Sequence, residues 1–371
     1  MIVAEYDWLV VFLCAALSCG FLIVTKQWHM SRTARGHAGS AVQSAHKMPT
    51  PRIGGVAIGL ALIASILFAP TSMLDNYVPF IVSLTPVFLA GLAEDFGYNV
   101  SPGKRLAAAA VSSVIAIALL GMWIDRTGIA YLDVIVSFAP VGIVLTVFAT
   151  AGVCNAFNLI DGLNGLSAGT GVLVAAGIAT IAYSGGDPNF AKLATLLIAA
   201  LAGFLVFNFP LGKLFLGDAG AYSLGHILAW FAILLLDRIS TASPWALLLV
   251  FFWPVADTLF AIYRRRRKGH KFDQPDRLHF HQLVMRGLEI VWLGRGRRSI
   301  SNPLATLVMM PFIAMPIVSG VVYWNRPIAC IGFFVAYSVL YVSAYYVGLA
   351  VIRRNRIKLG NVRSGPLSQG S

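Results

Sequence analysis

Long apolar runs dominate this sequence and decide what it can fold into. Runs of about 16 to 25 apolar residues, the length that a hydrocarbon layer of ~30 Å requires, occur eleven times in the 371 residues. They lie near 7–25, 54–70, 77–93, 105–123, 133–153, 166–184, 190–207, 220–237, 244–263, 304–323 and 327–351. Because 58% of the residues are hydrophobic, a water-soluble core is no plausible home for most of the chain. The sequence therefore predicts a polytopic membrane protein with about eleven transmembrane helices, and a count of ten is left open.

The positive charges are distributed unevenly between alternate connections. One set of connections, together with the C-terminal segment, holds 24 of the 28 Lys and Arg residues, and the other set holds 4. By the positive-inside rule, this asymmetry places the N-terminus outside and the C-terminus in the cytoplasm. The cytoplasmic connections are then about 26–53, 94–104, 154–165, 208–219 and 264–303. Residues 1–351 form one integral membrane domain, and we expect the basic segment 352–371 to be a disordered cytoplasmic tail.

The net charge of +13 also bears on partners. Because this charge is expected to face the cytoplasm beside lipid, anionic head groups and phosphorylated substrates are the favoured partners, and nucleic acid is not. The four Cys residues lie in or beside apolar runs, and no CxxC pair exists. We expect neither a disulfide framework nor a zinc site from them.

The first two cytoplasmic connections carry charge at their helix ends. Two prolines stiffen the backbone before Gly54 and Gly55, with Lys47 and Arg52 flanking this segment, which would suit a close approach to a ligand. A plain turn with interfacial charge is the alternative. The second connection opens with an acidic pair, Glu94–Asp95. Adjacent carboxylates at a helix C-terminus are disfavoured, so a divalent cation or a lysine is expected to compensate, unless both are solvated loop acids.

The third and fourth connections concentrate amide and carboxylate groups. On a helix, Asn155, Asn158 and Asp161 fall at i, i+3 and i+6, so they converge on one side of an apolar segment before Asp-Gly and Asn-Gly pairs end it. Asp218 lies between glycines at a predicted helix start, where its carboxylate suits a hard cation and the backbone suits an oxyanion. The alternatives are capping and turn formation.

The fifth connection holds a basic run, 264–268, and two histidines. The basic run is interpreted as topology and lipid anchoring. His279 and His281 share a face only if the backbone between them is extended. No further ligand completes a zinc pattern, so phosphate contact is favoured over solvated loop histidines. Asp257 lies inside the span before them, and we expect it to face the polar site or pair with a basic residue.

Taken in this order, the five segments resemble the polyprenyl-phosphate N-acetylhexosamine-1-phosphate transferases, the superfamily that also contains phospho-MurNAc-pentapeptide translocase. The likeness covers roughly 47–282, and the segment 49–55 resembles the version found in enzymes that start O-antigen, teichoic-acid and related glycans. The resemblance implies an all-α bundle with its site at the cytoplasmic face of the bacterial inner membrane. It also implies transfer from a UDP-N-acetylhexosamine to a polyprenyl phosphate, usually undecaprenyl phosphate, with Mg²⁺, which Mn²⁺ can replace, and with release of UMP.

The resemblance also assigns roles to residues. It implies magnesium binding by Asp218, stacking of uracil on Phe215, and a catalytic or lipid-phosphate role for the acidic pair. We expect the catalytic residues to be Asp95, Glu94 and Asp161. The substrate-binding residues are expected to be Lys47, Arg52, Asn155, Asn158, Asn164, Asn208, Phe215, His279 and His281. The chain departs from the family pattern at Glu94, usually aspartate, at Gln282, often histidine, and at Ala221, often serine.

Several alternatives stay open at this point. The lipid phosphate attacks the UDP-sugar directly, or Asp95 holds the phosphosugar covalently in a double displacement. A transporter also suits a chain of eleven spans, but such sites usually lie near the bilayer midplane between repeats, and no convincing repeat is found. A non-catalytic scaffold for glycan assembly is a third class. Membrane lipids are expected partners, and a homodimer is left open.

Overall fold

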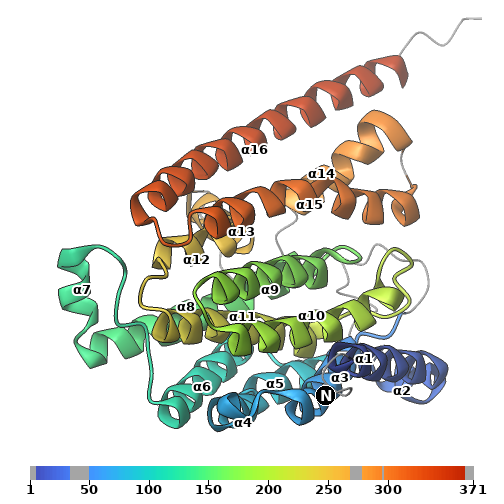
Figure 1. Ribbon diagram of the computed structural model, residues 1–371. Coiled ribbons are helices and arrows are strands. Elements are labelled where there is room, and N and C mark those ends of the chain that lie inside the picture. Colours follow the sequence, from blue (N-terminus) through green and yellow to red (C-terminus); the bar gives the residue numbers. More distant parts are fainter. Residues whose placement is uncertain (1–5, 34–49, 268–277, 295, 364–371) are drawn as a thin grey trace, which may run out of the picture.

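The computed structural model describes residues 6–33, 50–267, 278–294 and 296–363. Every regular element in these ranges is helical, as the resemblance implied (Figure 1). The elements are α1 (Asp7–Val24), α2 (Lys26–Thr33), α3 (Gly54–Ser65), η2 (Ile66–Phe68), η3 (Thr71–Met73), α4 (Leu74–Ser83), α5 (Thr85–Asp95), α6 (Pro102–Leu120), α7 (Ala130–Val136), α8 (Ala139–Ile160), α9 (Leu166–Ser184), α10 (Pro188–Asn208), α11 (Gly217–Arg238), α12 (Pro244–Val250), α13 (Phe252–Arg267), α14 (Phe280–Leu288), η4 (Glu289–Leu293), α15 (Arg298–Val322) and α16 (Pro327–Arg363).

The helices agree with the lower count of ten spans that the sequence left open. Within the described residues, nine helices are long and apolar enough to cross a membrane. A tenth span is the pair α12 and α13, which is bent by 78°. The eleventh predicted span is the shorter apolar helix Gly54–Phe68. The protein is therefore a multi-pass membrane protein built as a helical bundle.

The predicted span 133–153 begins in the wrong place. α7 ends at Val136, and α8 begins at Ala139 after the extended residue Phe138. Pro140 lies in the first turn of α8, where proline is favoured because its missing N–H would have no helical partner anyway. α8 continues to Ile160 and carries Asn155 and Asn158 in its last two turns.

The C-terminal segment also differs from the prediction. α16 continues to Arg363, so helix covers the first part of the segment 352–371, for which composition favoured disorder. Arg, Lys and Leu propagate a helix well once a long apolar span has nucleated it, and overall composition does not include that nucleation.

The core of the bundle is α11. Its residues are buried without interruption from Gly217 to Leu235, and it packs against α3, α5, α8 and α9. Two glycines permit close approaches to its first turns. A Cβ on Gly55 would lie 2.3 Å from the backbone nitrogen of Gly220, and one on Gly91 would lie 2.5 Å from the Cα of Ala219. α3 and α5 thus touch the first turns of α11 backbone to backbone.

The last helices form a separate side of the bundle. Figure 1 shows α14, α15 and α16 together along one side, with α1 to α6 along the other and α8 to α11 between them. The bent pair of α12 and α13 connects the central helices to this side. Residues from both sides therefore reach the start of α11 and the end of α8.

Candidate active site

Asp95 binds the start of α11. It is the last residue of α5, it is fully buried, and its two carboxylate oxygens accept the backbone N–H groups of Asp218 (2.8 Å) and Ala219 (2.9 Å). Leu216, which precedes α11, has no side-chain cap to offer. A carboxylate from another helix therefore satisfies the exposed N–H groups and faces the positive end of the helix dipole. This contact joins the second and fourth connections.

Asp218 faces two arginines. Its Oδ1 lies 3.6 Å from Nη2 of Arg52, and its Oδ2 forms an ion pair with Nη1 of Arg105. The Arg105 guanidinium also lies over the ring of Tyr222, 5.7 Å from its centroid. Asp218 is 5% exposed. A buried carboxylate needs charged or hydrogen-bonding partners, and Asp218 has a charged partner on each oxygen.

Arg105 is a site residue that the sequence analysis missed. It lies in the first turn of α6, which Ser101 caps by accepting the N–H of Lys104. We predicted that a divalent cation or a lysine compensates the Glu94–Asp95 pair. In the structure, backbone N–H groups of α11 bind Asp95, and two arginines from separate connections pair with Asp218. A basic residue in the first turn of a capped helix was the available signal.

The first connection docks on the fourth through the backbone. The N–H groups of Gly54 and Gly55 donate to the carbonyls of Phe215 (2.9 Å) and Leu216 (2.8 Å), and the N–H of Phe215 donates to the carbonyl of Pro51 (2.9 Å). This pairing fixes Arg52 beside Asp218, and Phe215 is half-buried. Lys47 lies outside the described residues.

The end of α8 brings the third connection to the same place. Asp161 follows the last helical residue as its C-cap, and Oδ1 of Asn155 lies 3.4 Å from the Tyr222 hydroxyl. Asn158 is half-buried one turn later. Burial raises the pKa of Asp161 to about 7, and the positive charge of Arg52 opposes that rise. α8 carries Asn155 and Asn158 at the predicted helical spacing, and it ends at Ile160, directly before Asp161.

Asn164 and Asn208 hold the loops together. Asn208 accepts the N–H of Gly165 (2.6 Å) and donates to the carbonyl of Leu214 (2.8 Å). Asn164 donates its side-chain amide to the carbonyl of Pro210 (2.8 Å). Both residues are almost fully buried. The structure thus gives these amides a scaffolding role, and their expected contact with the nucleotide stays a prediction.

The histidines of the fifth connection reach the third. His279 is extended (φ −63°, ψ 151°), and the two imidazole rings stack with centroids 5.7 Å apart and planes 15° apart. The prediction of an extended backbone holds for His279 alone, since α14 begins at Phe280, and the rings meet at this entry into the helix. A Cβ on Gly162 would lie 2.6 Å from Nε2 of His281, so that ring rests against the turn that follows Asp161.

Five connections far apart in sequence therefore meet at one end of the bundle. The contacts join the end of α5, the start of α6, the end of α8 and the start of α11, with Arg52 and the histidines beside them. The carboxylates are hard oxygen donors, which suit Mg²⁺. Oε2 of Glu94 is buried without a hydrogen-bond partner within the described chain. Within the described residues, no group of three or more His, Cys, Asp or Glu side chains is already arranged to hold a metal ion.

The donor types thus fit a divalent cation, with Asp218 the most central candidate. Asp161 and Glu94 are the neighbouring carboxylates that would complete its surroundings. Arg52 and Arg105 supply the positive charge at Asp218 in this structure. Fold and site together define a multi-pass membrane protein with a charged, loop-built site at one end of its helical bundle.

Comparison with known proteins places the chain in a family. Residues 77–236 match the model of glycosyl transferase family 4. A probable undecaprenyl-phosphate N-acetylglucosaminyl 1-phosphate transferase of Bacillus subtilis is 31% identical over 241 residues, which cover 65% of this chain and 67% of that protein. The decaprenyl-phosphate N-acetylglucosaminephosphotransferase of Mycobacterium tuberculosis H37Rv is 30% identical over 271 residues, with 65% and 66% covered. An undecaprenyl-phosphate alpha-N-acetylglucosaminyl 1-phosphate transferase of Salmonella typhi is 29% identical over 253 residues, with 65% and 66% covered.

The chain belongs to the polyprenyl-phosphate N-acetylhexosamine-1-phosphate transferase family. The match spans about two thirds of the length of these relatives. The family predicted from the five motifs is confirmed.

Proposed function

We propose that the protein transfers an N-acetylhexosamine-1-phosphate from a UDP-sugar to a polyprenyl phosphate, undecaprenyl phosphate in the first instance. The products are a lipid-linked sugar diphosphate and UMP, and the reaction initiates a cell-envelope glycan. The names of the relatives support the acceptor and the N-acetylglucosamine-1-phosphate group. The observation that carries the proposal is the meeting of Asp95, Asp218 and Arg52, from three connections, at one buried point of a membrane bundle.

The reaction is a phosphoryl transfer. An oxygen of the lipid phosphate bonds to the sugar-bearing phosphorus, and the bond from that phosphorus to the bridging oxygen breaks. UMP leaves with the electron pair. Because a phosphate monoester has a second pKa near ~6, the nucleophile is largely ionised and needs orientation more than a base. The side chains of Arg52 and Arg105 provide fixed positive charge for the phosphate oxygens.

A divalent cation belongs to the proposal. Asp218 would hold Mg²⁺, with Asp161 and Glu94 as neighbouring carboxylates. The ion supplies neutralisation of the charge on the diphosphate and the leaving group. The Arg52 side chain remains 38% exposed and is therefore accessible to a phosphate of the substrate. Phe215 is half-buried, and its backbone pairs with that of Pro51, so its ring is our candidate for stacking on the base.

The surroundings of Asp95 favour direct attack over double displacement. A covalent nucleophile needs an oxygen that the substrate phosphorus can reach, but Asp95 is fully buried and both of its oxygens are held by backbone N–H groups of α11. We therefore assign Asp95 to positioning α11 and Asp218. Initial rates measured while both substrates vary separate the mechanisms, since direct attack predicts intersecting lines and a covalent intermediate predicts parallel ones.

We also propose that this end of the bundle faces the cytoplasm of the bacterial inner membrane, with the N-terminus outside. The site is built from the connections that, together with the C-terminal segment, carry 24 of the 28 Lys and Arg residues, and such connections stay on the cytoplasmic side. A UDP-sugar is made in the cytoplasm, so the donor and the site are then in the same compartment.

The test is turnover by the purified full-length protein in detergent. Radiolabelled UDP-N-acetylglucosamine and undecaprenyl phosphate are supplied with Mg²⁺, and label extracted into organic solvent is measured together with released UMP. We expect equal amounts of the two products, loss of both in EDTA, and recovery with added Mg²⁺. A panel of UDP-sugars identifies the donor. Absence of product with every donor would contradict the proposal.

A further inference from the structure

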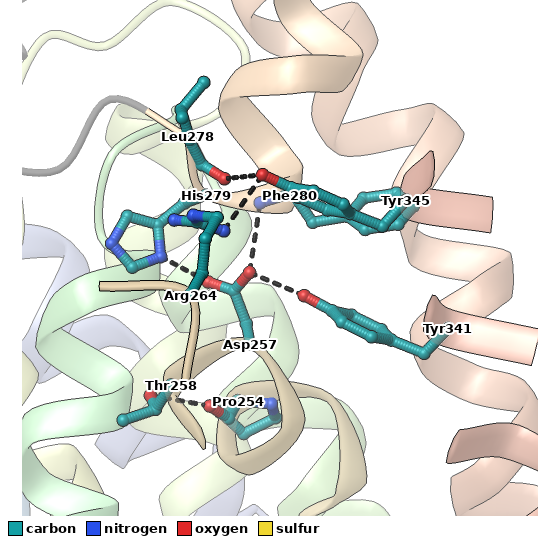
Figure 2. A network of polar contacts seen from close by, with 9 residues as sticks. All are labelled: Pro254, Asp257, Thr258, Arg264, Leu278, His279, Phe280, Tyr341 and Tyr345. Atoms are coloured by element: carbon teal, nitrogen blue, oxygen red, sulfur yellow. Dashed lines mark hydrogen bonds and ion pairs between the residues drawn. The ribbon is translucent and has the colours of Figure 1, made fainter. Parts of the chain in front are cut away.

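Asp257 lies outside the catalytic cluster described above, and its whole carboxylate is directed at the histidine segment. It lies in α13 and is 3% exposed. Its Oδ2 lies 2.7 Å from Nδ1 of His279, and its Oδ1 accepts the N–H of Phe280 (3.0 Å) and the hydroxyl of Tyr341 (2.8 Å). Figure 2 shows these contacts converging from α13, the start of α14 and α16.

The contact with Asp257 fixes the tautomer of His279. A carboxylate only accepts hydrogen bonds, so Nδ1 of His279 must carry the proton between them. Nε2, across the ring, is then the nitrogen presented away from Asp257 (Figure 2). A carboxylate behind an imidazole also makes Nε2 more basic and locks the ring orientation, as second partners of metal-bound and catalytic histidines do.

The last helix supports this arrangement. The Tyr345 hydroxyl donates to the carbonyl of Leu278 (3.0 Å) and accepts from Nη1 of Arg264 (2.9 Å). The ring of Phe280 packs against Trp253 and Tyr341, at centroid distances of 5.1 and 5.2 Å. The residues on both sides of His279 are therefore bound to α13 and α16, which leaves the imidazole little freedom to turn.

The stacked histidine pair connects His279 to the active site. His279 stacks on His281, which rests against Gly162, the residue after Asp161. A histidine held in this way offers Nε2 to a phosphate oxygen at a fixed angle. A histidine on a loop without these contacts would lose conformational entropy each time it bound a phosphate oxygen.

We propose that Asp257, supported by Tyr341 of α16, is a positioning residue that holds His279 with Nε2 directed at a phosphate group of the substrates. The inference rests on the proposed function for the identity of those substrates. Asp257 touches no substrate itself and acts through His279. Because both residues lie beyond 77–236, the match to the family model does not include them.

The first experiment is a double-mutant cycle on UMP release. Removal of a second partner of this kind costs about 10–100-fold, so Asp257→Asn should lower kcat by that factor, with a smaller change in KM for the UDP-sugar. Tyr341→Phe should lower kcat several-fold. In a His279→Ala background, neither substitution should lower kcat further, because the residue through which they act is gone. Losses that multiply in that background would overturn the proposal.

The matched control is Thr258→Ala. Thr258 is the next residue of α13 and is similarly buried. Its hydroxyl donates to the carbonyl of Pro254 in the same helix (2.9 Å; Figure 2). It should leave kcat within twofold of wild type. If Asp257→Asn fails to fold, the milder Tyr341→Phe variant carries the test.

A second experiment does not depend on turnover. In full-length protein labelled with ¹⁵N-histidine, the His279 signal, assigned by its loss in His279→Ala, should be that of the Nδ1–H tautomer. Asp257→Asn should shift this signal, and Thr258→Ala should not. An Nε2–H tautomer in wild type, or no shift in Asp257→Asn, would refute the positioning role. Absent turnover with the expected signal would instead count against the proposed function alone.

Discussion

Substitution of Gly55 by alanine tests how closely the first connection must approach α11. The new Cβ would lie 2.3 Å from the backbone nitrogen of Gly220 and 2.6 Å from its Cα, where ordinary contacts are about 3.5–4.0 Å. The obstacle is backbone, so no side-chain rotation relieves it. The helices must separate by about 1 Å.

The magnitudes follow from this separation. Overpacking of a well-packed core costs about 1–3 kcal/mol, and alanine returns about 1 kcal/mol through its better helix propensity. We expect a net loss of stability. The larger effect is on turnover, since Gly55 donates to the carbonyl of Leu216, directly before the turn that carries Asp218. A displacement of about 1 Å at reacting groups can cost about 10²-fold in rate.

The assay compares UMP release and thermal unfolding for wild type, Gly55→Ala and Gly152→Ala. Gly152 lies in α8, and a Cβ there would meet nothing within 4 Å, so it controls for the change from glycine to alanine. We expect it to retain activity and to unfold at the same or a slightly higher temperature. Wild-type turnover in Gly55→Ala would refute the close backbone contact between α3 and α11.

Two further predictions concern the loops of the site. Asn208→Ala removes the partners of the Gly165 N–H and the Leu214 carbonyl, and each buried orphan costs about 1–3 kcal/mol. The unfolding temperature should therefore fall, and an unchanged value would contradict the scaffolding role. For Asp161, burial raises the pKa to about 7, so ionisation opposes folding. In EDTA, stability should be highest below pH ~4 and fall toward pH ~7. Asp161→Asn should lose that decline, and a parallel pH dependence in the variant would contradict it.

The bundle was predictable because apolar run length is set by the bilayer. Each of the eleven marked spans is mainly helical in the structure. The start of α8 was missed because the apolar residues 134–136 and 138 lead directly into it, although Phe138 is extended and Pro140 opens a new helix. Hydropathy measures length and composition and does not register where the backbone changes direction.

The residue types of the site were predictable, and their partners were not. Asp95 and Asp218 were identified separately, but only the fold shows that the carboxylate of one caps the helix that carries the other. Asn208 was expected to bind substrate. In the structure its side-chain amide accepts from one loop and donates to another. Arg105 was counted only as a positive-inside charge, because its contact with Asp218 crosses more than a hundred residues of sequence.

The central claim is that distant loops form one site around Asp218, and paired variants of α11 test it most directly. Asp218 and Asp237 lie at opposite ends of this helix, and Asp237 is exposed. Both are changed to asparagine in the full-length protein, and UMP release is measured with UDP-N-acetylglucosamine and undecaprenyl phosphate. We predict that Asp218→Asn lowers turnover by at least about 100-fold without unfolding the protein, while Asp237→Asn stays near wild type. Full turnover in Asp218→Asn would contradict the claim.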